Sequence, residues 1–359
     1  MEKSRAIPRG RASLPWRTNE RSAPAAATGR RVVRAWRSPS NLFLASLSAM
    51  AETIACLMRG KVELLDGQGR AMGPLLSPHR LQADARGPAR DVDPIVSVTR
   101  GRIRGELYYA IGVPNGTALF AQTPGSSDEQ QLFLGVDAQI TELDFSYGDE
   151  ALACTVPGPR GTSAIGSLAD DGKGVRTVTE GDVVDCTPRW APGGRAEILY
   201  ASAGVGRTKS GQWGGLSPFA LHRLRFADNT VEVLTADAKY DYLSPIASSD
   251  SILYAIRRPY RALRQAAPLT AIFRAFLPKS ERPASSEARD PEERELVRIT
   301  PGRIEGVARG VLAFDIAANG DVVYATRSRI FRNPSSASSA VGSAEPIATL
   351  EQVEQVVIC

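Results

Sequence analysis

Hydrophobic and polar residues alternate over short stretches of this chain, as they do in half-buried β-strands. Residues 187–203 read TPRWAPGGRAEILYASA, which is a strand end, a Pro-Gly-Gly turn and a second apolar strand. Residues 219–226 and 231–235 continue as two further strands, and the same order precedes them at 163–169 and 175–179. No long amphipathic helix pattern interrupts these strands. The sequence therefore predicts an all-β fold rather than a βαβ fold.

The motif of an apolar strand end, a Gly/Asn/Asp turn and a second apolar strand recurs along the chain. In each copy we compare the residue at the same position before the turn. These residues are Val96, in a looser copy, and Phe145, Trp190, Ala247 and Ile316. The steps between these positions are 49, 45, 57 and 69 residues, and propeller blades recur at roughly 40–50 residues. Insertions account for the two long steps, a Gly/Ser-rich loop at 203–218 and a charged, Pro/Ser-rich loop at 277–293.

Each copy begins a unit of one inner strand, two middle strands and an outer strand. A single four-stranded sheet cannot bury both of its faces, but sheets stacked around an axis bury them against their neighbours. The sequence thus predicts a β-propeller. The Trp190 position then lies between adjacent blades, and we expect Trp190 to serve packing rather than to form a ligand platform.

The two ends of the chain supply the parts of one further blade. Residues 353–358 form an inner strand with nothing after it, and 53–58, 61–65 and 71–77 supply the three missing strands. Joining the ends in one sheet removes exposed strand edges. We expect six four-stranded blades closed by both chain ends, with five or seven as alternatives. Cys56 and Cys359 would then lie in neighbouring strands, where a disulfide would be possible if its strict geometry were met.

The motif at 188–201, P-x-W-[SA]-P-[DG]-G followed by an apolar strand, resembles the repeat of TolB-type propellers, a WD-repeat-like family. The resemblance covers roughly residues 90–350. Gly193 stands where the family has the Asp of its Pro-Asp-Gly turn, and Tyr147 replaces the turn Pro in another copy. The resemblance implies a non-enzymatic, protein-binding scaffold in a bacterial envelope.

Residues 1–51 are rich in Arg, Ser, Pro and Ala and are expected to form a disordered basic tail, whereas 52–359 form the propeller. The apolar run at 42–51 with Ala49-x-Ala51 matches a secretory signal cleaved after Ala51, which predicts a periplasmic or extracellular protein. A start at Met50 would instead make the protein cytoplasmic. A lipid on Cys56 would be the one route to membrane association.

Charge and side-chain composition exclude several function classes. The net charge is +5, but residues 1–50 carry +8, so the body is near neutral and nucleic acid is not an expected partner. The four cysteines and two histidines, His79 and His222, are scattered and predict no metal site. Gly67-x-Gly69 lacks a third glycine, 204–210 lacks the phosphate-loop pattern, and we expect no cofactor.

The remaining candidates for function are surface loops. Propellers usually bind at one rim, through loops that join the second strand to the third and one blade to the next. Exposed Trp, Tyr and Arg are typical of binding hot spots. Two loops carry such residues, Arg207, Lys209 and Trp213 in the first and Arg257, Arg258, Tyr260 and Arg261 in the second. We expect a monomer that binds a protein partner there, with an acidic surface as one possibility at the arginines.

Two other function classes stay open. One is a secreted hydrolase or lyase whose carboxylates converge in the central channel. Its candidate residues lie near the starts of inner strands, at Asp91, Asp144, Asp185 and Asp241. Two of them would have to lie about 5–10 Å apart for glycoside chemistry. The other class is a sugar- or peptide-binding sensor. No catalytic residue is assigned.

Overall fold

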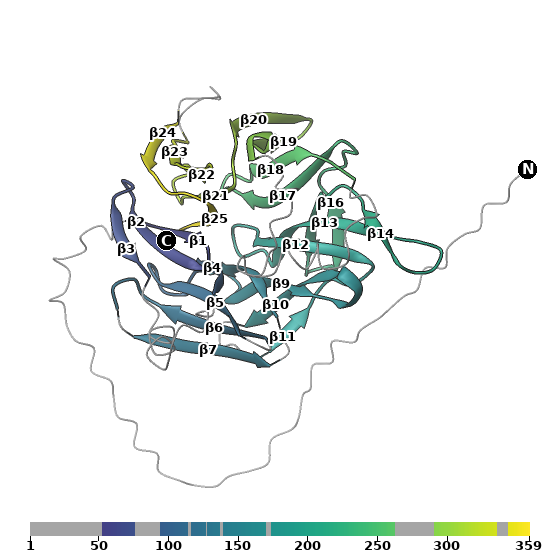
Figure 1. The fold of residues 1–359 in the computed structure, drawn as a ribbon, viewed down its shortest axis with the longest axis horizontal. Helices are drawn as coiled ribbons and strands as arrows, with labels where there is room; N and C mark the ends of the chain where they lie inside the picture. The colour runs from purple at the N-terminus through teal and green to yellow at the C-terminus, as the bar shows by residue number, and fades with distance from the viewer. Residues whose placement is uncertain are drawn as a thin grey trace, which may run out of the picture. The chain divides into compact units, whose positions relative to one another are not determined.

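The computed structural model describes residues 52–75, 94–113, 116–126, 128–136, 139–169, 174–262, 291–335 and 344–359. These residues belong to one compact unit, which spans 49–359. They form six blades of four antiparallel strands each, numbered 1 to 6 in the order of their inner strands along the chain (Figure 1). The all-β propeller prediction with six blades is confirmed.

In blades 1 to 3 the chain runs from the inner strand outward. Blade 1 consists of β4 (Ile95–Arg100), β5 (Leu107–Val113), β6 (Gly116–Gln122) and β7 (Glu129–Val136). Blade 2 consists of β8 (Thr141–Ser146), β9 (Ala151–Pro157), β10 (Ser163–Ala169) and β11 (Val175–Thr177), with a 3-10 turn η1 (Pro159–Gly161). Blade 3 consists of β12 (Val183–Trp190), β13 (Glu197–Arg207), β15 (Ala220–Arg225) and β16 (Thr230–Val233).

Blades 4 to 6 have the same order from the inner strand to the outer strand. Blade 4 consists of β17 (Tyr240–Ala247), β18 (Leu253–Pro259), β19 (Glu295–Thr300) and β20 (Arg303–Arg309), with a 3-10 turn η3 (Pro291–Glu293). Blade 5 consists of β21 (Ala313–Ile316), β22 (Val322–Ala325), β23 (Ile330–Asn333) and β24 (Glu345–Ala348). Blade 6 consists of β25 (Val353–Ile358), β1 (Thr53–Met58), β2 (Lys61–Asp66) and β3 (Ala71–Pro74).

Two features depart from this regular plan. An additional strand, β14 (Trp213–Leu216), forms a hairpin with the C-terminal end of β13, where it pairs with Val205, Gly206 and Arg207. A single parallel bridge between Ser163 and Val184 joins blades 2 and 3 into one continuous sheet. The hairpin is the larger departure, because within the described ranges no other blade contains a strand beyond its four.

The inner strands close the ring. Each of β4, β8, β12, β17 and β21 contacts the inner strand of the next blade, and β25 contacts β4. In blade 6, β25 pairs with β1 along its length, with Cys56 opposite Val356 and Ile54 opposite Ile358. The predicted closure by both chain ends is therefore confirmed.

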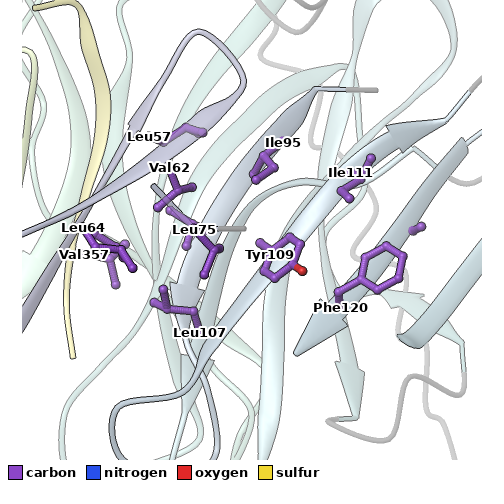
Figure 2. Close-up of a cluster of buried hydrophobic side chains, with 13 residues drawn as sticks. Leu57, Val62, Leu64, Leu75, Ile95, Leu107, Tyr109, Ile111, Phe120 and Val357 are labelled. Atoms are coloured by element: carbon purple, nitrogen blue, oxygen red, sulfur yellow. The ribbon is translucent and has the colours of Figure 1, made fainter. Parts of the chain in front are cut away.

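Hydrophobic clusters fill the spaces between neighbouring blades. The described residues contain six such clusters, and each combines side chains of two adjacent blades. Figure 2 shows the cluster between blades 6 and 1, where Val62, Leu64 and Val357 face Leu107 and Tyr109. This arrangement follows from the strand pattern, since each sheet carries apolar residues on both faces and has no layer but its neighbours to cover them.

The motif residues lie in these clusters. Phe145 belongs to the cluster between blades 1 and 2, and Ile316 to the one between blades 4 and 5. Trp190 is half-buried between blades 2 and 3 and stacks on Phe226 with ring centroids 5.9 Å apart. The packing role predicted for Trp190 is confirmed.

The turn after Trp190 explains the two glycines of the motif. Gly193 has φ 91° and Gly194 has φ 61°, a left-handed conformation that favours glycine. This turn also touches the equivalent turn of blade 2, because a Cβ on Gly148 would lie 2.5 Å from Gly194 Cα. Glycine in the motif therefore serves both the turn and the contact between blades.

One sequence expectation, the position of the looser motif copy, needs correction, and the disulfide that the sequence left possible is absent. The looser copy of the motif is out of register, because the turn of blade 1 follows Arg100, which pairs with Leu107, and not Val96. The disulfide between Cys56 and Cys359 does not form, since both are free thiols. Cys56 packs between blades 5 and 6 and Cys359 against the cluster between blades 6 and 1, so the two side chains face opposite sides of the sheet. Burial raises the pKa of both thiols to about 12.

Replacing Trp190 by alanine should destabilise the ring. Truncation of a large aromatic core side chain costs about 3–5 kcal/mol, and the half-buried position of Trp190 places the expected loss near the lower end. Urea denaturation followed by circular dichroism measures it. The matched control is Trp213→Ala, because Trp213 is half-buried in the β14 hairpin and belongs to none of the inter-blade clusters among the described residues. Equal losses for the two variants would contradict the inter-blade role.

Candidate functional site

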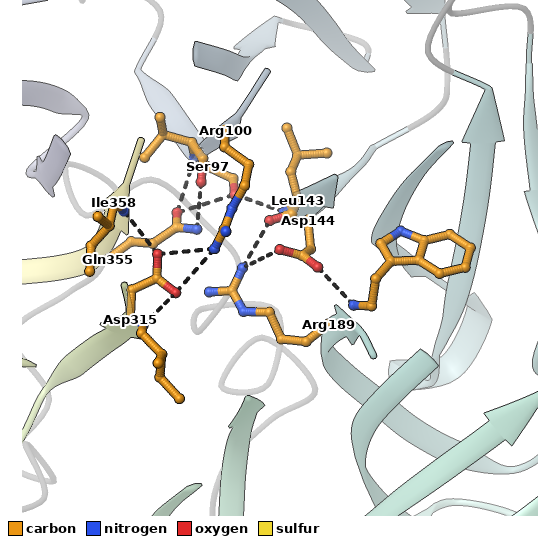
Figure 3. A network of polar contacts seen from close by, with 11 residues as sticks. Ser97, Arg100, Leu143, Asp144, Arg189, Asp315, Gln355 and Ile358 are labelled. Carbon is orange, nitrogen blue, oxygen red and sulfur yellow. Dashed lines mark hydrogen bonds and ion pairs between the residues drawn. The ribbon is translucent and has the colours of Figure 1, made fainter. Parts of the chain in front are cut away.

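Four charged residues on inner strands meet at the axis of the ring (Figure 3). Arg100 Nη2 of β4 lies 3.3 Å from both carboxylate oxygens of Asp315 on β21. Arg189 Nη1 of β12 lies 3.2 Å from Asp144 Oδ1 on β8 and donates to Leu143 O at 3.3 Å. Each pair of opposite charges thus joins the inner strands of two different blades.

Both axial carboxylates also accept main-chain hydrogen bonds from the next blade. Asp144 Oδ2 accepts from Trp190 N at 2.7 Å, and Asp315 Oδ2 accepts from Ile358 N at 2.8 Å. Gln355 makes a comparable link, accepting from Val98 N at 3.0 Å and donating to Val98 O at 2.7 Å. These contacts hold neighbouring inner strands in register.

A third set of contacts repeats at the bulges of three inner strands. Glu142, Thr187 and Ser244 each have φ between 51° and 55°, three residues before Phe145, Trp190 and Ala247. Glu142 Oε2 accepts from Thr187 N at 2.7 Å, and Thr187 Oγ1 accepts from Ser244 N at 3.1 Å. The bulges of blades 3 and 4 therefore each expose a main-chain donor that the preceding blade satisfies.

Electrostatics at the axis favour a structural role for these groups. Burial raises the pKa of the Asp144 carboxyl, and the Arg189 and Arg100 guanidinium groups oppose that rise. Asp315 raises the pKa of Arg100. Each of the two carboxylates, Asp144 and Asp315, holds an arginine and a main-chain N–H of the next blade. These contacts join inner strands and favour a structural role for both residues.

The other carboxylates proposed for an enzyme lie apart from this network. Asp241 accepts hydrogen bonds from Arg258 Nε at 2.9 Å and from Phe219 N at 3.1 Å. Asp185 has one buried oxygen, Oδ1, with no partner in the described residues, and burial raises the pKa of its carboxyl. The His222 ring packs against Tyr200 in a tilted arrangement with centroids 5.4 Å apart, and burial lowers the pKa of His222. Asp91 and His79 lie outside the described residues.

The sequence could have indicated part of this axial network. Arg100, Arg189, Asp315 and Gln355 were not among the candidate residues. The available signal was a charged residue inside an apolar inner strand, as in Phe314-Asp315-Ile316. Their partners could not be assigned, because the pairs are 45 and 215 residues apart in the chain.

Glu142→Gln should change stability in a pH-dependent way. Burial raises the pKa of Glu142 above its usual value near 4.5, so the folded state binds this proton more tightly than the unfolded chain. The wild type therefore loses stability as the pH rises through the raised pKa, whereas glutamine keeps the acceptor and carries no charge. We expect a urea midpoint higher by about 0.3 M at pH 8 and unchanged near pH 4. Glu150→Gln, at an exposed position, is the control and should shift neither midpoint.

The two surface loops predicted from the sequence meet at one rim. Each joins the second strand to the third strand of its blade, β13 to β15 in blade 3 and β18 to β19 in blade 4. Tyr260 Oη donates to Leu216 O at 2.5 Å. A cleft of about 370 Å³ lies between the loops, lined by residues 204–206 and 214–217 with Tyr260 and Ala262. We call the segments 203–218 and 257–262 together the β14 rim.

The arginines of the β14 rim are neutralised by carboxylates. Arg207 Nε donates to Asp182 Oδ2 at 2.9 Å. Arg257 pairs with Glu295 at 2.5 Å and Arg258 with Asp241 at 2.9 Å, whereas Arg261 pairs with Glu293. Each of these arginines therefore has an intramolecular carboxylate that would compete with an acidic partner for the same guanidinium group.

The other candidates at the rim differ in exposure. Lys209 is exposed at the hairpin tip and has no ion-pair partner among the described residues, whereas Trp213 and Tyr260 are half-buried. The structure thus brings all seven predicted residues to one side of blades 3 and 4.

Neither a metal-binding cluster nor a membrane-spanning helix is found in the part of the chain that the structure describes. No group of three or more His, Cys, Asp or Glu side chains there could hold a metal ion. None of the helices in those ranges is long and apolar enough to cross a membrane. Cys56, the residue that would carry a lipid, is fully buried within β1.

Comparisons with known proteins show the fold. No protein-family model and no curated protein sequence matches the chain. Among solved structures, TolB from Acinetobacter baumannii is similar, with 14% identity and a TM-score of 0.56 over 86% of this chain and 66% of that one. A chain of a nidogen/laminin complex has 10% identity and a TM-score of 0.54, covering 86% of this chain and 98% of that one. The putative TolB from Agrobacterium tumefaciens has 12% identity, a TM-score of 0.48 and coverage of 85% and 92%.

Proposed function

We propose that this chain is a non-enzymatic β-propeller scaffold that binds a partner protein at the β14 rim. The observation that carries the proposal is the β13–β14 hairpin, which extends blade 3 beyond its four strands and forms a cleft with Tyr260 of blade 4. Ring closure does not need this hairpin. Its half-buried Trp213 and the neighbouring Tyr260 are of the residue types that dominate binding energy at protein interfaces.

The fold is compatible with such a role. The neighbour from the nidogen/laminin complex shows that a chain of similar fold takes part in a protein assembly. The alternative, a hydrolase or lyase with carboxylates at the ring axis, has weaker support. Of its candidate carboxylates, Asp144 and Asp241 each hold an arginine and a main-chain donor, and only Asp185 keeps an oxygen without a partner among the described residues.

Site-specific photo-crosslinking in the native cell tests the binding proposal. A photoreactive residue at position 209 or 213 should give an adduct with one identified protein. The same group at Asp250, in the turn between the first and second strands of blade 4, should give none. Gly206→Leu should abolish the adduct, because a Cβ there meets its nearest atom at an ordinary 3.6 Å and the side chain fills the cleft. The absence of an adduct from both rim positions, or an equal adduct from position 250, would contradict the proposal.

We also propose that a signal peptide is cleaved between Ala51 and Glu52 and that the mature protein resides in a bacterial envelope. The secretory pattern at 42–51 supports this, and β1 begins at Thr53, so cleavage there leaves the blade 6 strands complete. Intact mass and N-terminal sequencing of the native protein should give a start at Glu52. A start at Met50 would place the protein in the cytoplasm and overturn this proposal.

A further inference from the structure

Among the described residues no strand pairs with the side of β14 that faces away from β13, so this side has the form of an open sheet edge. Ser217 N donates to Gly204 O at 2.9 Å, and Gly206 pairs with Gly215. Between these pairs, Val205 N donates to Asp182 O at 2.8 Å and not to β14. Leu216, which lies opposite Val205, therefore directs its N–H and C=O away from β13.

Tyr260 occupies part of this edge. Its hydroxyl donates to Leu216 O at 2.5 Å, the carbonyl that the main-chain N–H of an added strand would approach. The cleft beside it has a floor of glycines, Gly204, Gly206, Gly214 and Gly215, which leaves room for side chains of an incoming segment. Strand addition uses an exposed edge for affinity and adjacent pockets for specificity.

Two exposed lysines near the β13–β14 hairpin and Tyr260 indicate the kind of segment. Lys209 at the hairpin tip and Lys239 are exposed, and neither has an ion-pair partner among the described residues. Lys239 lies beside the cleft, because its carbonyl accepts from Tyr260 N at 2.8 Å. The neighbouring Asp237 accepts from Lys239 N at 2.8 Å through Oδ1. Because the arginines of the β14 rim are paired with carboxylates, Lys209 in the rim and Lys239 beside it supply positive charge without an ion-pair partner among the described residues.

We infer that the free edge of β14 takes up an extended segment of the partner protein, with β-branched residues at its centre and acidic residues at its ends. This inference rests on the proposed function and specifies how the partner binds. The segment adds to β14 as a strand antiparallel or parallel to it, its main chain pairs with Leu216, and its acidic ends face Lys209 and Lys239.

Fluorescence anisotropy with the full chain tests the inference. The probe is a labelled peptide with blocked ends, Glu-Thr-Val-Thr-Val-Glu, compared with the same core flanked by lysines. The acidic peptide should bind roughly fivefold tighter at low salt, and the difference should shrink as salt screens the lysines. A probe with N-methyl groups on both central residues lacks the two central N–H donors, one of which would face Leu216 O, and should bind about tenfold more weakly.

Protein variants give matched controls. Leu216→Pro removes the outward N–H, whereas Leu216→Ala keeps it, so we expect about a tenfold loss for the first and less than about threefold for the second. Tyr260→Phe frees Leu216 O from a competing donor and should tighten binding about two- to fivefold. Equal binding of the methylated and unmethylated probes, or loss of binding in Tyr260→Phe, would overturn the inference.

The crosslinking experiment separates this inference from the proposed function. If the adduct at position 209 persists in Leu216→Pro and the acidic peptide does not bind the wild type, the rim binds a protein but not by strand addition. If no adduct forms at all, the proposed function itself fails. A concentration-dependent dimer in sedimentation that Leu216→Pro abolishes would assign the edge to a second copy of this chain and overturn the inference.

Discussion

A chain that ends at Gln352 should fail to fold. The deletion removes β25, the inner strand of blade 6, and with it the buried side chains of Val353, Val356, Val357 and Ile358. At about 1.5–3 kcal/mol for each buried side chain, the loss is about 6–12 kcal/mol. That equals most of the stability of a typical domain, about 5–15 kcal/mol.

The deletion also opens the ring. β25 pairs with β1 and contacts both β21 and β4, so its absence exposes two hydrophobic clusters and an inner strand edge. Circular dichroism and urea denaturation of the purified chain should show no cooperative transition. The control is Glu351→Ala at an exposed position just before the strand, which should behave as the wild type does. A cooperative transition of the truncated chain within about 1 M urea of the wild type would show that closure does not stabilise the fold.

Asp315→Ala should cost about 3–5 kcal/mol of unfolding free energy, the usual effect of removing one member of a buried ion pair. The Asp315 side chain is 4% exposed and holds both Arg100 and the main-chain N–H of Ile358. Its loss leaves a guanidinium and an N–H at the axis without an acceptor. Urea denaturation of the single variant measures this cost.

A double-mutant cycle distinguishes the ion pair from simple loss of packing. Arg100→Met together with Asp315→Ala should cost clearly less than the sum of the two single losses, because the second change removes the charge that the first leaves unpaired. The matched surface pair is Arg70 with Asp66, where the Arg70 side chain is 80% exposed. Arg70→Ala should cost less than about 1 kcal/mol. If the stability losses of Arg100→Met and Asp315→Ala simply add in the double variant, the two residues are not energetically coupled and the prediction is wrong.

The sequence predicted the blades correctly where the signal lies within a few consecutive residues. The turn glycines after Trp190, the alternation at 219–226 and the apolar end at 353–358 each reflect conformational and burial preferences of a few consecutive residues. Repetition of these local signals also predicted Trp190, Phe145 and Ile316 as inter-blade packing residues. Where repetition was weak, at Val96, the predicted register was wrong because the longer turn of blade 1 follows Arg100.

The candidate site was predicted in part for the same reason. Loop composition placed Arg207, Trp213 and Tyr260 at one rim, but it could not show that Asp182, Glu295 and Glu293 neutralise the neighbouring arginines. Those ion pairs join residues 25 to 38 positions apart, and such pairing depends on how strands are placed in space. The free edge of β14 and the unpaired lysines beside it were equally invisible in the sequence.

By itself, the sequence determined the strand pattern, the repeat and the joining of both chain ends in one blade, because turns and alternation are set by neighbouring residues. Only the tertiary structure decided which charges meet at the axis and that Cys56 and Cys359 face opposite sides of their sheet. It also decided that the β14 edge beside Tyr260 has no second strand paired to it among the described residues. These features depend on contacts between residues far apart in the sequence, and such contacts form only when the blades close into a ring.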